Sequence, residues 1–287
     1  GPPGAGKSML AARLPWLLPL LTAAEALEVT MINSLAGQLP EGGLIIQRPF
    51  REPHHSSSIA ALVGGGTKAR PGEVSLAHGG VLFLDELAEW QRGHLDALRQ
   101  TVESGKAVVS RANHHVTYPA RFQLIAAMNP CRCGYLGDPA RACTKAPLCS
   151  RQYLSRISGP MLDRFDMMIE VGEVPISAMS RSGEGEDTAV ILERVHAARE
   201  FASIRPQQKD NPINAQLPPD RLEDAVRLQA KASKLIEDAA EKQGLSARGY
   251  HRVLKVARTI ADLDQSGDVT TAHAGEALQY RRLPVQA

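Results

Sequence analysis

The chain has 287 residues, of which 43% are hydrophobic, 22% are charged and 4% are aromatic. This length suits one large domain or two ordinary ones, and the composition excludes disordered, collagen-like and coiled-coil chains. Because 33 Lys and Arg residues face 31 Asp and Glu residues, the net charge of +2 gives no global positive field, and any contact with nucleic acid must come from local patches.

We expect no membrane or export signal within these 287 residues. No apolar run reaches the roughly 18 to 20 residues that cross a bilayer. The longest candidate, residues 14–21, is interrupted by two prolines, so we expect no membrane partner. The chain opens with Gly1 rather than Met, which indicates a fragment. Its four cysteines gather in one stretch instead of spreading as a disulfide framework, which predicts a reducing, cytoplasmic location.

The opening residues GPPGAGKS fit the pattern G-x-x-x-x-G-K-[ST] of a phosphate-binding loop. Backbone N–H groups of such a loop, with the N-terminus of the next helix, surround a polyphosphate. We expect Lys7 to reach the β and γ phosphates of ATP and the Ser8 hydroxyl to bind Mg²⁺. The predicted nucleotide-binding residues are Gly1, Gly4, Ala5, Gly6, Lys7 and Ser8. A plain Gly/Pro turn is the alternative, but the helical pattern MLAARLPWLL follows directly. A buried strand normally precedes this loop, so we expect one upstream.

Helical patterns at residues 8–21 and 22–32 come next, followed by a glycine- and proline-rich insertion at about residues 37–80. The apolar run VLFL, residues 81–84, then predicts a buried strand that ends in Asp85 and Glu86. We expect Asp85 to hold Mg²⁺ and Glu86 to polarise the attacking water. A strand with a solvated acidic end is the alternative, which the phosphate loop disfavours.

A helix is predicted at residues 92–104, followed by a hairpin at about residues 105–119 with strands 106–111 and 115–118 around the tip 112–114. The strand 122–128 ends at Asn129, which we expect to orient the attacking water, although a strand-terminal Asn is often a turn former. Residues 167–171, MMIEV, predict another core strand.

Beyond this strand the pattern becomes helical. We predict an α/β domain at residues 1–176, a flexible linker at 177–187 and a small all-α lid domain at 188–287. The helices expected in the lid are residues 188–202, 220–242, 247–263 and 270–282.

This order of motifs resembles that of AAA+ ATPases, and more closely that of magnesium-chelatase-like AAA+ proteins of the ComM/YifB competence branch. The resemblance rests on strings along nearly the whole chain: GPPGAGKSMLAARLPWLLPLL, RPFREPHH, ALVGGG, LAHGGVLFLDEL, MNPCRCGYLGD, RISGPMLDRFD and SARGYHRVLKVARTIADL. It implies a homohexameric ring with ATP between subunits and DNA in or around the central channel. By the same resemblance, Arg164 is the arginine finger that enters the neighbouring subunit's site, and Arg248 is the sensor arginine of the lid. For either arginine, a surface salt bridge is the ordinary alternative.

Two basic regions are candidate contacts to DNA phosphates. The insertion carries Arg48 and Arg51, together with Lys68 and Arg70, and the hairpin region has no acidic residue between Ser104 and Arg121. The hairpin candidates are Lys106, Arg111, His114 and His115, with Arg121 at its base. Such side chains around a channel predict a sequence-independent, salt-sensitive grip on single-stranded or branched DNA. A solvated hairpin and loop are the alternative.

The loop 131–149 predicts a metal site. Four thiols, from Cys131, Cys133, Cys143 and Cys149, can close around a structural Zn²⁺ and replace a hydrophobic core. The spacing departs from two close pairs, because Cys-x-Cys is tight and five residues separate the last two cysteines. Reduced thiols in a surface loop are therefore the alternative. The adjacent pair His54 and His55 has no Cys or Asp nearby and is not predicted to bind a metal.

The combined interpretation is an ATP-driven DNA motor, a helicase or branch-migration translocase of natural transformation and recombination. The alternative is an ATPase subunit that remodels a protein partner, as the magnesium chelatase motor does. A protein unfoldase is a third class, but the aromatic-apolar-glycine loop that grips polypeptide is not found between the phosphate and acidic motifs.

Overall fold

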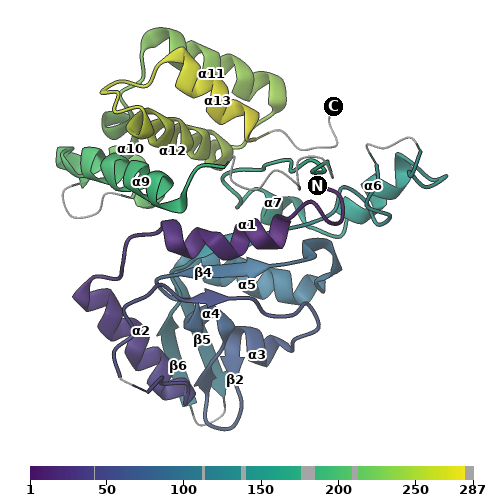
Figure 1. Ribbon diagram of the computed structural model, residues 1–287, viewed down its shortest axis with the longest axis vertical. Coiled ribbons are helices and arrows are strands. Elements are labelled where there is room, and N and C mark those ends of the chain that lie inside the picture. The colour runs from purple at the N-terminus through teal and green to yellow at the C-terminus, as the bar shows by residue number, and fades with distance from the viewer. Residues whose placement is uncertain (42, 112–113, 137–139, 176–184, 209–212, 282–287) are drawn as a thin grey trace. The chain divides into compact units, whose positions relative to one another are not determined.

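A computed structural model describes residues 1–41, 43–111, 114–136, 140–175, 185–208 and 213–281 (Figure 1). The chain divides into two compact units, Gly1–Leu162 with Val171–Ser182 and Asp163–Glu170 with Gly183–Ala287. Residues 163–170, which we had predicted to close the α/β domain, thus belong with the helical unit. There the Met168 N–H donates to the Tyr280 carbonyl at 2.7 Å. The strand predicted at 167–171 is wrong, because these residues form none of the repeated backbone bonds of a sheet.

The first unit is built on a parallel sheet in the order β1-β4-β7. Its strands are β1 (Phe50–Arg51), β4 (Val81–Leu84) and β7 (Gln123–Ala126). Strand β4 is central and buried on both faces, as its unbroken apolar run predicts. The prediction for β4 is confirmed, whereas β7 is shorter than the expected 122–128. We did not predict β1, since two residues beside a proline carry no periodic signal.

The helices that follow the phosphate loop begin and end where their capping residues dictate. Helix α1 (Lys7–Arg13) ends early, and Pro15, which lacks an N–H donor, falls in the 3₁₀ turn η1 (Leu14–Leu17). The predicted helix at 8–21 was therefore too long. Helix α2 (Ala23–Ala36) starts with a capping box between Thr22 and Glu25 and ends at Gly37, whose φ is 75°.

The insertion folds onto the hairpin. It contains α3 (Ile59–Val63), β2 (Gly64–Gly65), β3 (Arg70–Pro71) and α4 (Glu73–Leu76), and β2 pairs antiparallel with β3. The turn η2 (Leu87–Glu89), α5 (Arg92–Ser104), β5 (Lys106–Arg111) and β6 (His114–Pro119) follow β4. The predicted helix and hairpin are confirmed, and residues 112–113 of the tip lie outside the described residues. The Tyr118 hydroxyl donates to the Ala69 carbonyl at 2.8 Å, so the hairpin is fastened to the β2–β3 turn.

Short helices α6 (Leu148–Leu154) and α7 (Gly159–Leu162) close the first unit, and helices make up the second (Figure 1). The second unit contains α9 (Thr188–Ser203), η3 (Pro206–Gln208), η4 (Asn214–Gln216), α10 (Pro219–Val226), α11 (Ala230–Gln243), α12 (Ala247–Leu263) and α13 (Thr271–Gln279). The helix predicted at 220–242 is two helices, because Arg227 has φ 50° and Leu228 bridges to Val269. Most of the predicted linker lies outside the described residues.

The predicted fold class is confirmed, since a parallel-sheet α/β unit is joined to an all-α unit. Among the helices of the described residues, none is both long and apolar enough to cross a membrane.

Candidate functional site

The predicted nucleotide residues meet at the carboxyl edge of the sheet. Because β4 and β7 are parallel neighbours, Asp85 after β4 and Asn129 after β7 lie at the same edge. The Ser8 hydroxyl donates to Asp85 Oδ2 at 3.0 Å, and the Lys7 ammonium donates to Asn129 Oδ1 at 3.1 Å. The phosphate loop, the acidic strand and the strand-terminal amide are therefore one constellation.

The phosphate loop has the backbone that its glycines permit. Gly4 and Gly6 have φ values of 76° and 82°, in the region that favours glycine, and Ala5 between them is buried. The Lys7 ammonium donates to the carbonyls of Gly1 at 2.8 Å and Pro2 at 2.7 Å. Burial lowers the pKa of Lys7, and the charge of Asp85 opposes this shift. A phosphate that replaced these carbonyls would give the lysine a stronger, charged partner.

Glu86 adopts an unusual backbone conformation at the end of β4. Its φ is 51°, its N–H donates to Asp85 Oδ1 at 2.8 Å, and its side chain is 55% exposed. The carboxylate Oε2 lies 3.3 Å from Nδ1 of His55, a contact that our sequence analysis missed. The signal was topological, since a residue shortly after β1 reaches the same sheet edge as one after β4 once those strands pair in parallel.

Comparison with known proteins identifies the family of the chain. The profile of the family "Magnesium chelatase, subunit ChlI" matches residues 1–179, and the profile of its C-terminal region matches residues 185–281. The chain belongs to this family. The family assignment makes it an AAA+ protein with an α/β unit and a helical C-terminal unit.

Among individual relatives, this AAA+ chain is 48% identical over 285 residues to "Competence protein ComM" of Haemophilus influenzae, covering 99% of this chain and 55% of that protein. It is 47% identical over 284 residues to YifB of Escherichia coli, with the same shares covered. The "Magnesium-chelatase 38 kDa subunit" of Cereibacter sphaeroides is 29% identical over 147 residues, 45% of this chain and 43% of that subunit. The chain therefore lies in the ComM/YifB branch, and it spans about half the length of these ComM and YifB relatives.

Both predicted arginines of the AAA+ chain lie in its helical unit. Arg164 is buried at 7% exposure, and Arg248 is exposed in the first turn of α12. Asp163 accepts a hydrogen bond from Ser246, the N-cap of α12, at 3.0 Å. The segment with Arg164 and the helix with Arg248 are thus fastened together, while the finger and sensor roles stay predictions.

Two predicted DNA contacts need correction. The Arg48 guanidinium donates to the carbonyls of Pro19 and Gly79 and pairs with Glu25, and its side chain is 12% exposed. Arg51 forms a bidentate ion pair with Glu73, at 2.6 and 2.7 Å, and this bond raises the pKa of Arg51. Both guanidinium groups form hydrogen bonds and ion pairs within the chain, so we remove Arg48 and Arg51 from the candidate DNA contacts.

The remaining DNA candidates are only partly described. Lys106 and His115 are exposed on the hairpin, and Lys68, Arg70 and Arg121 are exposed around it. The side chains of Arg111 and His114 lie outside the described residues, so their predicted roles stay predictions.

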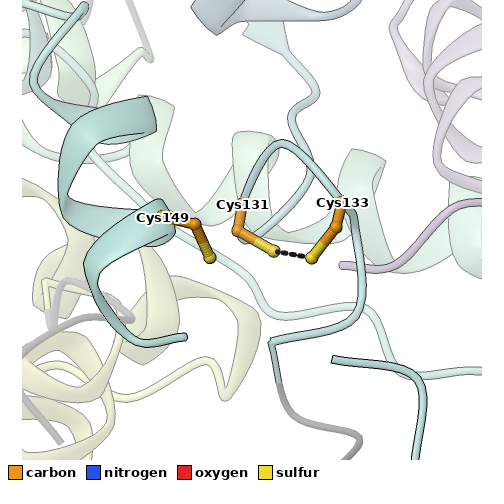
Figure 2. Close-up of side chains that lie close together, drawn as sticks. All are labelled: Cys131, Cys133 and Cys149. Atoms are coloured by element: carbon orange, nitrogen blue, oxygen red, sulfur yellow. Dashed lines mark hydrogen bonds between the residues drawn. The ribbon is translucent and has the colours of Figure 1, made fainter. Parts of the chain in front are cut away.

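Three of the four cysteine side chains in the loop 131–149 lie close together. The Sγ atoms of Cys131, Cys133 and Cys149 lie within 4.8 Å of one another, and Figure 2 shows the three side chains converging from a tight turn and from α6. Cys143, the fourth predicted ligand, is not part of this trio and influences the acidity of Cys133 and Cys149 from its edge. This donor set of soft sulfurs suits Zn²⁺.

The two ends of the cluster differ in acidity. Hydrogen bonds from the Tyr135 backbone and from Cys131 lower the pKa of Cys133 to about 6. A bond to Cys143, together with burial, raises the pKa of Cys149 to about 12.

Proposed function

We propose that the chain is the ATP-hydrolysing motor of a ring-shaped DNA translocase that drives branch migration during natural transformation and recombination. The observation that carries the ATPase part is the joining of Lys7 to Asn129 and of Ser8 to Asp85 at one sheet edge. These are the charges and hydrogen-bond donors that phosphoryl transfer from ATP to water requires.

The reaction follows from the roles of the chain's own groups. Lys7 and the loop N–H groups bind the β and γ phosphates, and Ser8 with Asp85 would hold Mg²⁺, which neutralises phosphate charge. Glu86 accepts a proton from the attacking water, and Asn129 orients that water. In a homohexamer, Arg164 of a neighbouring subunit would add positive charge at the γ phosphate, and Arg248 would report the nucleotide to the lid.

Support for DNA as the substrate comes from the hairpin and from the relative named for competence. Lys106 and His115 are exposed on the β5–β6 hairpin, and the β2–β3 turn bonded to it exposes Lys68. Contacts from such groups to the phosphate backbone give binding that ignores base sequence and weakens with salt. A cytoplasmic location goes with this function.

One observation favours a second function. The similarity to a magnesium-chelatase 38 kDa subunit supports an ATPase that remodels a protein partner instead of DNA. The two functions differ in what stimulates ATP turnover, DNA for the first and a partner protein for the second.

The deciding experiment measures ATP turnover by the full-length protein with single-stranded, duplex and forked DNA at low and moderate salt. We expect stimulation that falls with salt and falls again in Lys106→Ala and Arg111→Ala. Lys234→Ala removes an exposed charge from α11 of the other unit and is the matched control. Turnover that ignores DNA in an assembled, ATP-hydrolysing ring would favour the remodelling function.

A further inference from the structure

We propose that the four cysteines hold a structural zinc ion and that this centre sets the affinity of the adjoining phosphate loop for Mg-nucleotide. The inference rests on the nucleotide binding proposed above and goes beyond it by making the loop's affinity depend on a metal. All residues concerned lie in the first unit.

Three of the four thiols need little movement to close around zinc, and Cys143 must approach them to complete the tetrahedron. A Zn–S bond of about 2.3 Å places sulfurs about 3.8 Å apart in a tetrahedron. The Cys131 and Cys133 sulfurs are 3.1 Å apart, and the trio with Cys149 lies within 4.8 Å. Four thiolates leave no open position, so the ion would be structural and not catalytic.

The backbone around the thiols is already shaped as a ligand turn. The Gly134 N–H donates to the Cys131 carbonyl at 3.0 Å, and Gly134 has φ 87°, which closes the turn tightly. Backbone N–H groups of Tyr135 and Cys143 hydrogen-bond the Cys133 sulfur. Such bonds stabilise a thiolate and orient it as second-shell groups orient metal ligands.

One connection to the nucleotide site runs along the chain. Asn129 accepts a hydrogen bond from the Lys7 ammonium, and only Pro130 separates it from the buried Cys131. The Pro130 carbonyl accepts a hydrogen bond from Ser150 at 2.7 Å, and Ser150 follows Cys149 on α6. Zinc bound by Cys131 and Cys149 would thus hold Pro130 in two ways, through its chain neighbour Cys131 and through the hydrogen bond from Ser150. Asn129, the predicted water-orienting residue, directly precedes Pro130.

A second connection runs through space. A Cβ added to Gly134 would lie 2.5 Å from Pro3 Cδ and 2.6 Å from Pro3 Cγ, so the cysteine turn rests directly on the phosphate loop. The same loop lies against the end of β7, because the Gly1 nitrogen lies 3.3 Å from the Met128 carbonyl oxygen. Loss of the metal would loosen the turn that supports Pro3 and raise the entropy cost of ordering the loop around phosphates.

The first measurement determines zinc per chain by elemental analysis and the Kd for MgADP by calorimetry, using full-length protein. We expect one zinc ion per chain, and loss of zinc in Cys143→Ser and Cys149→Ser with a Kd for MgADP weakened about tenfold. Thr144→Ala, an exposed neighbour of Cys143, is the matched control and keeps both properties. Because binding linkage is reciprocal, chelator competition must show MgADP tightening zinc by the same factor.

A second set of variants keeps all four thiols, so it tests the coupling even where a cysteine variant unfolds. Gly134→Ala pushes a methyl group against Pro3 and also strains the turn, because its φ is 87°, so zinc is measured in the same sample. We expect bound zinc with weakened MgADP affinity. The double variant with Pro3→Ala removes the obstructing ring atoms and should recover part of that affinity, beyond the sum of the single effects.

The outcomes separate the two proposals. Zinc-free protein with four titratable thiols or with a disulfide overturns the metal centre. Zinc in the wild-type protein, with an unchanged Kd for MgADP both in the zinc-free cysteine variants and in Gly134→Ala, overturns the coupling alone. Zinc-loaded protein that binds no nucleotide overturns the proposed ATPase together with the coupling, whereas a failure of DNA to stimulate turnover leaves this inference standing.

Discussion

The His55 imidazole Nδ1 lies 3.3 Å from the Glu86 carboxylate Oε2. His55 follows β1 and the phosphate loop adjoins β7, so the sheet order β1-β4-β7 puts them on opposite sides of the strand that carries Glu86. The contact therefore gives the predicted catalytic carboxylate a side-chain partner within the chain. The loop around His55 is anchored elsewhere, since His94 of α5 contacts the Ser57 carbonyl at 2.8 Å.

Removing this contact should release the carboxylate. We expect His55→Ala to raise DNA-independent ATP turnover about fivefold, because a contact to a charged group is worth about 1 kcal/mol, and to reduce further stimulation by DNA. His55→Asn, which can still donate to Glu86, should restore the resting rate. His54→Ala, which loses a bond to Ser56 instead, is the control. Unchanged turnover in His55→Ala would remove the role from this histidine.

The finger role of Arg164 is tested by mixing two inactive variants. Glu86→Gln should bind ATP without hydrolysing it, and Arg164→Ala should be inactive in the ring. In random mixed hexamers, about one interface in four joins an intact Glu86 to an intact Arg164 of the next subunit. We therefore expect turnover to return on mixing. If activity stays absent in mixed rings verified by mass spectrometry, Arg164 acts within its own subunit or only in folding.

Arg48 should matter for stability and not for DNA. Its guanidinium satisfies the carbonyls of Pro19 and Gly79, so Arg48→Ala leaves buried acceptors without their donor. We expect a loss of about 2 kcal/mol in unfolding free energy, measured by urea denaturation, with an unchanged salt dependence of DNA binding. Lys106→Ala should show the reverse, a smaller salt slope and unchanged stability. A reduced salt slope in Arg48→Ala would return this residue to the DNA surface.

Glu25 gives the stability a definite pH dependence. Burial alone would raise the pKa of Glu25, but hydrogen bonds from Thr22 and the charge of Arg48 outweigh it and lower the pKa from 4.5. A carboxyl with a lowered folded pKa stabilises the fold above its unfolded pKa, and this stabilisation is lost as pH falls through the folded value. Because the Glu25 side chain is 37% exposed and solvent screens its charge, Glu25→Gln should cost only about 0.5 kcal/mol at neutral pH and less as the pH falls below 4.5.

Denaturation of both proteins between pH 3 and 8 measures this difference. The exposed Glu41→Gln is the control, with no expected change across the range. A constant difference between wild type and Glu25→Gln at every pH would mean that the carboxylate charge plays no part in capping α2.

The sequence was sufficient where the signal is local. The phosphate loop, β4, α5 and α12 were placed correctly, because a glycine pattern, a buried apolar run or a helical period with its caps is complete within a few residues. The nucleotide constellation also followed, since parallel strands bring their carboxyl ends to one edge whatever the loops between them do.

Tertiary structure decided what depends on partners distant in sequence. Strand β1 has two residues and exists by pairing with β4, whereas residues 167–171 join no sheet. Arg48 looked like a free cation until its carbonyl partners were in place, and His55 acquired a role only when β1 paired beside β4. The gathering of Cys149 with Cys131 is of the same kind. The charge of a side chain and the periodicity of apolar residues can be read from neighbouring residues in the sequence. Which groups a side chain hydrogen-bonds, and which residues it lies near, depend on the folded chain.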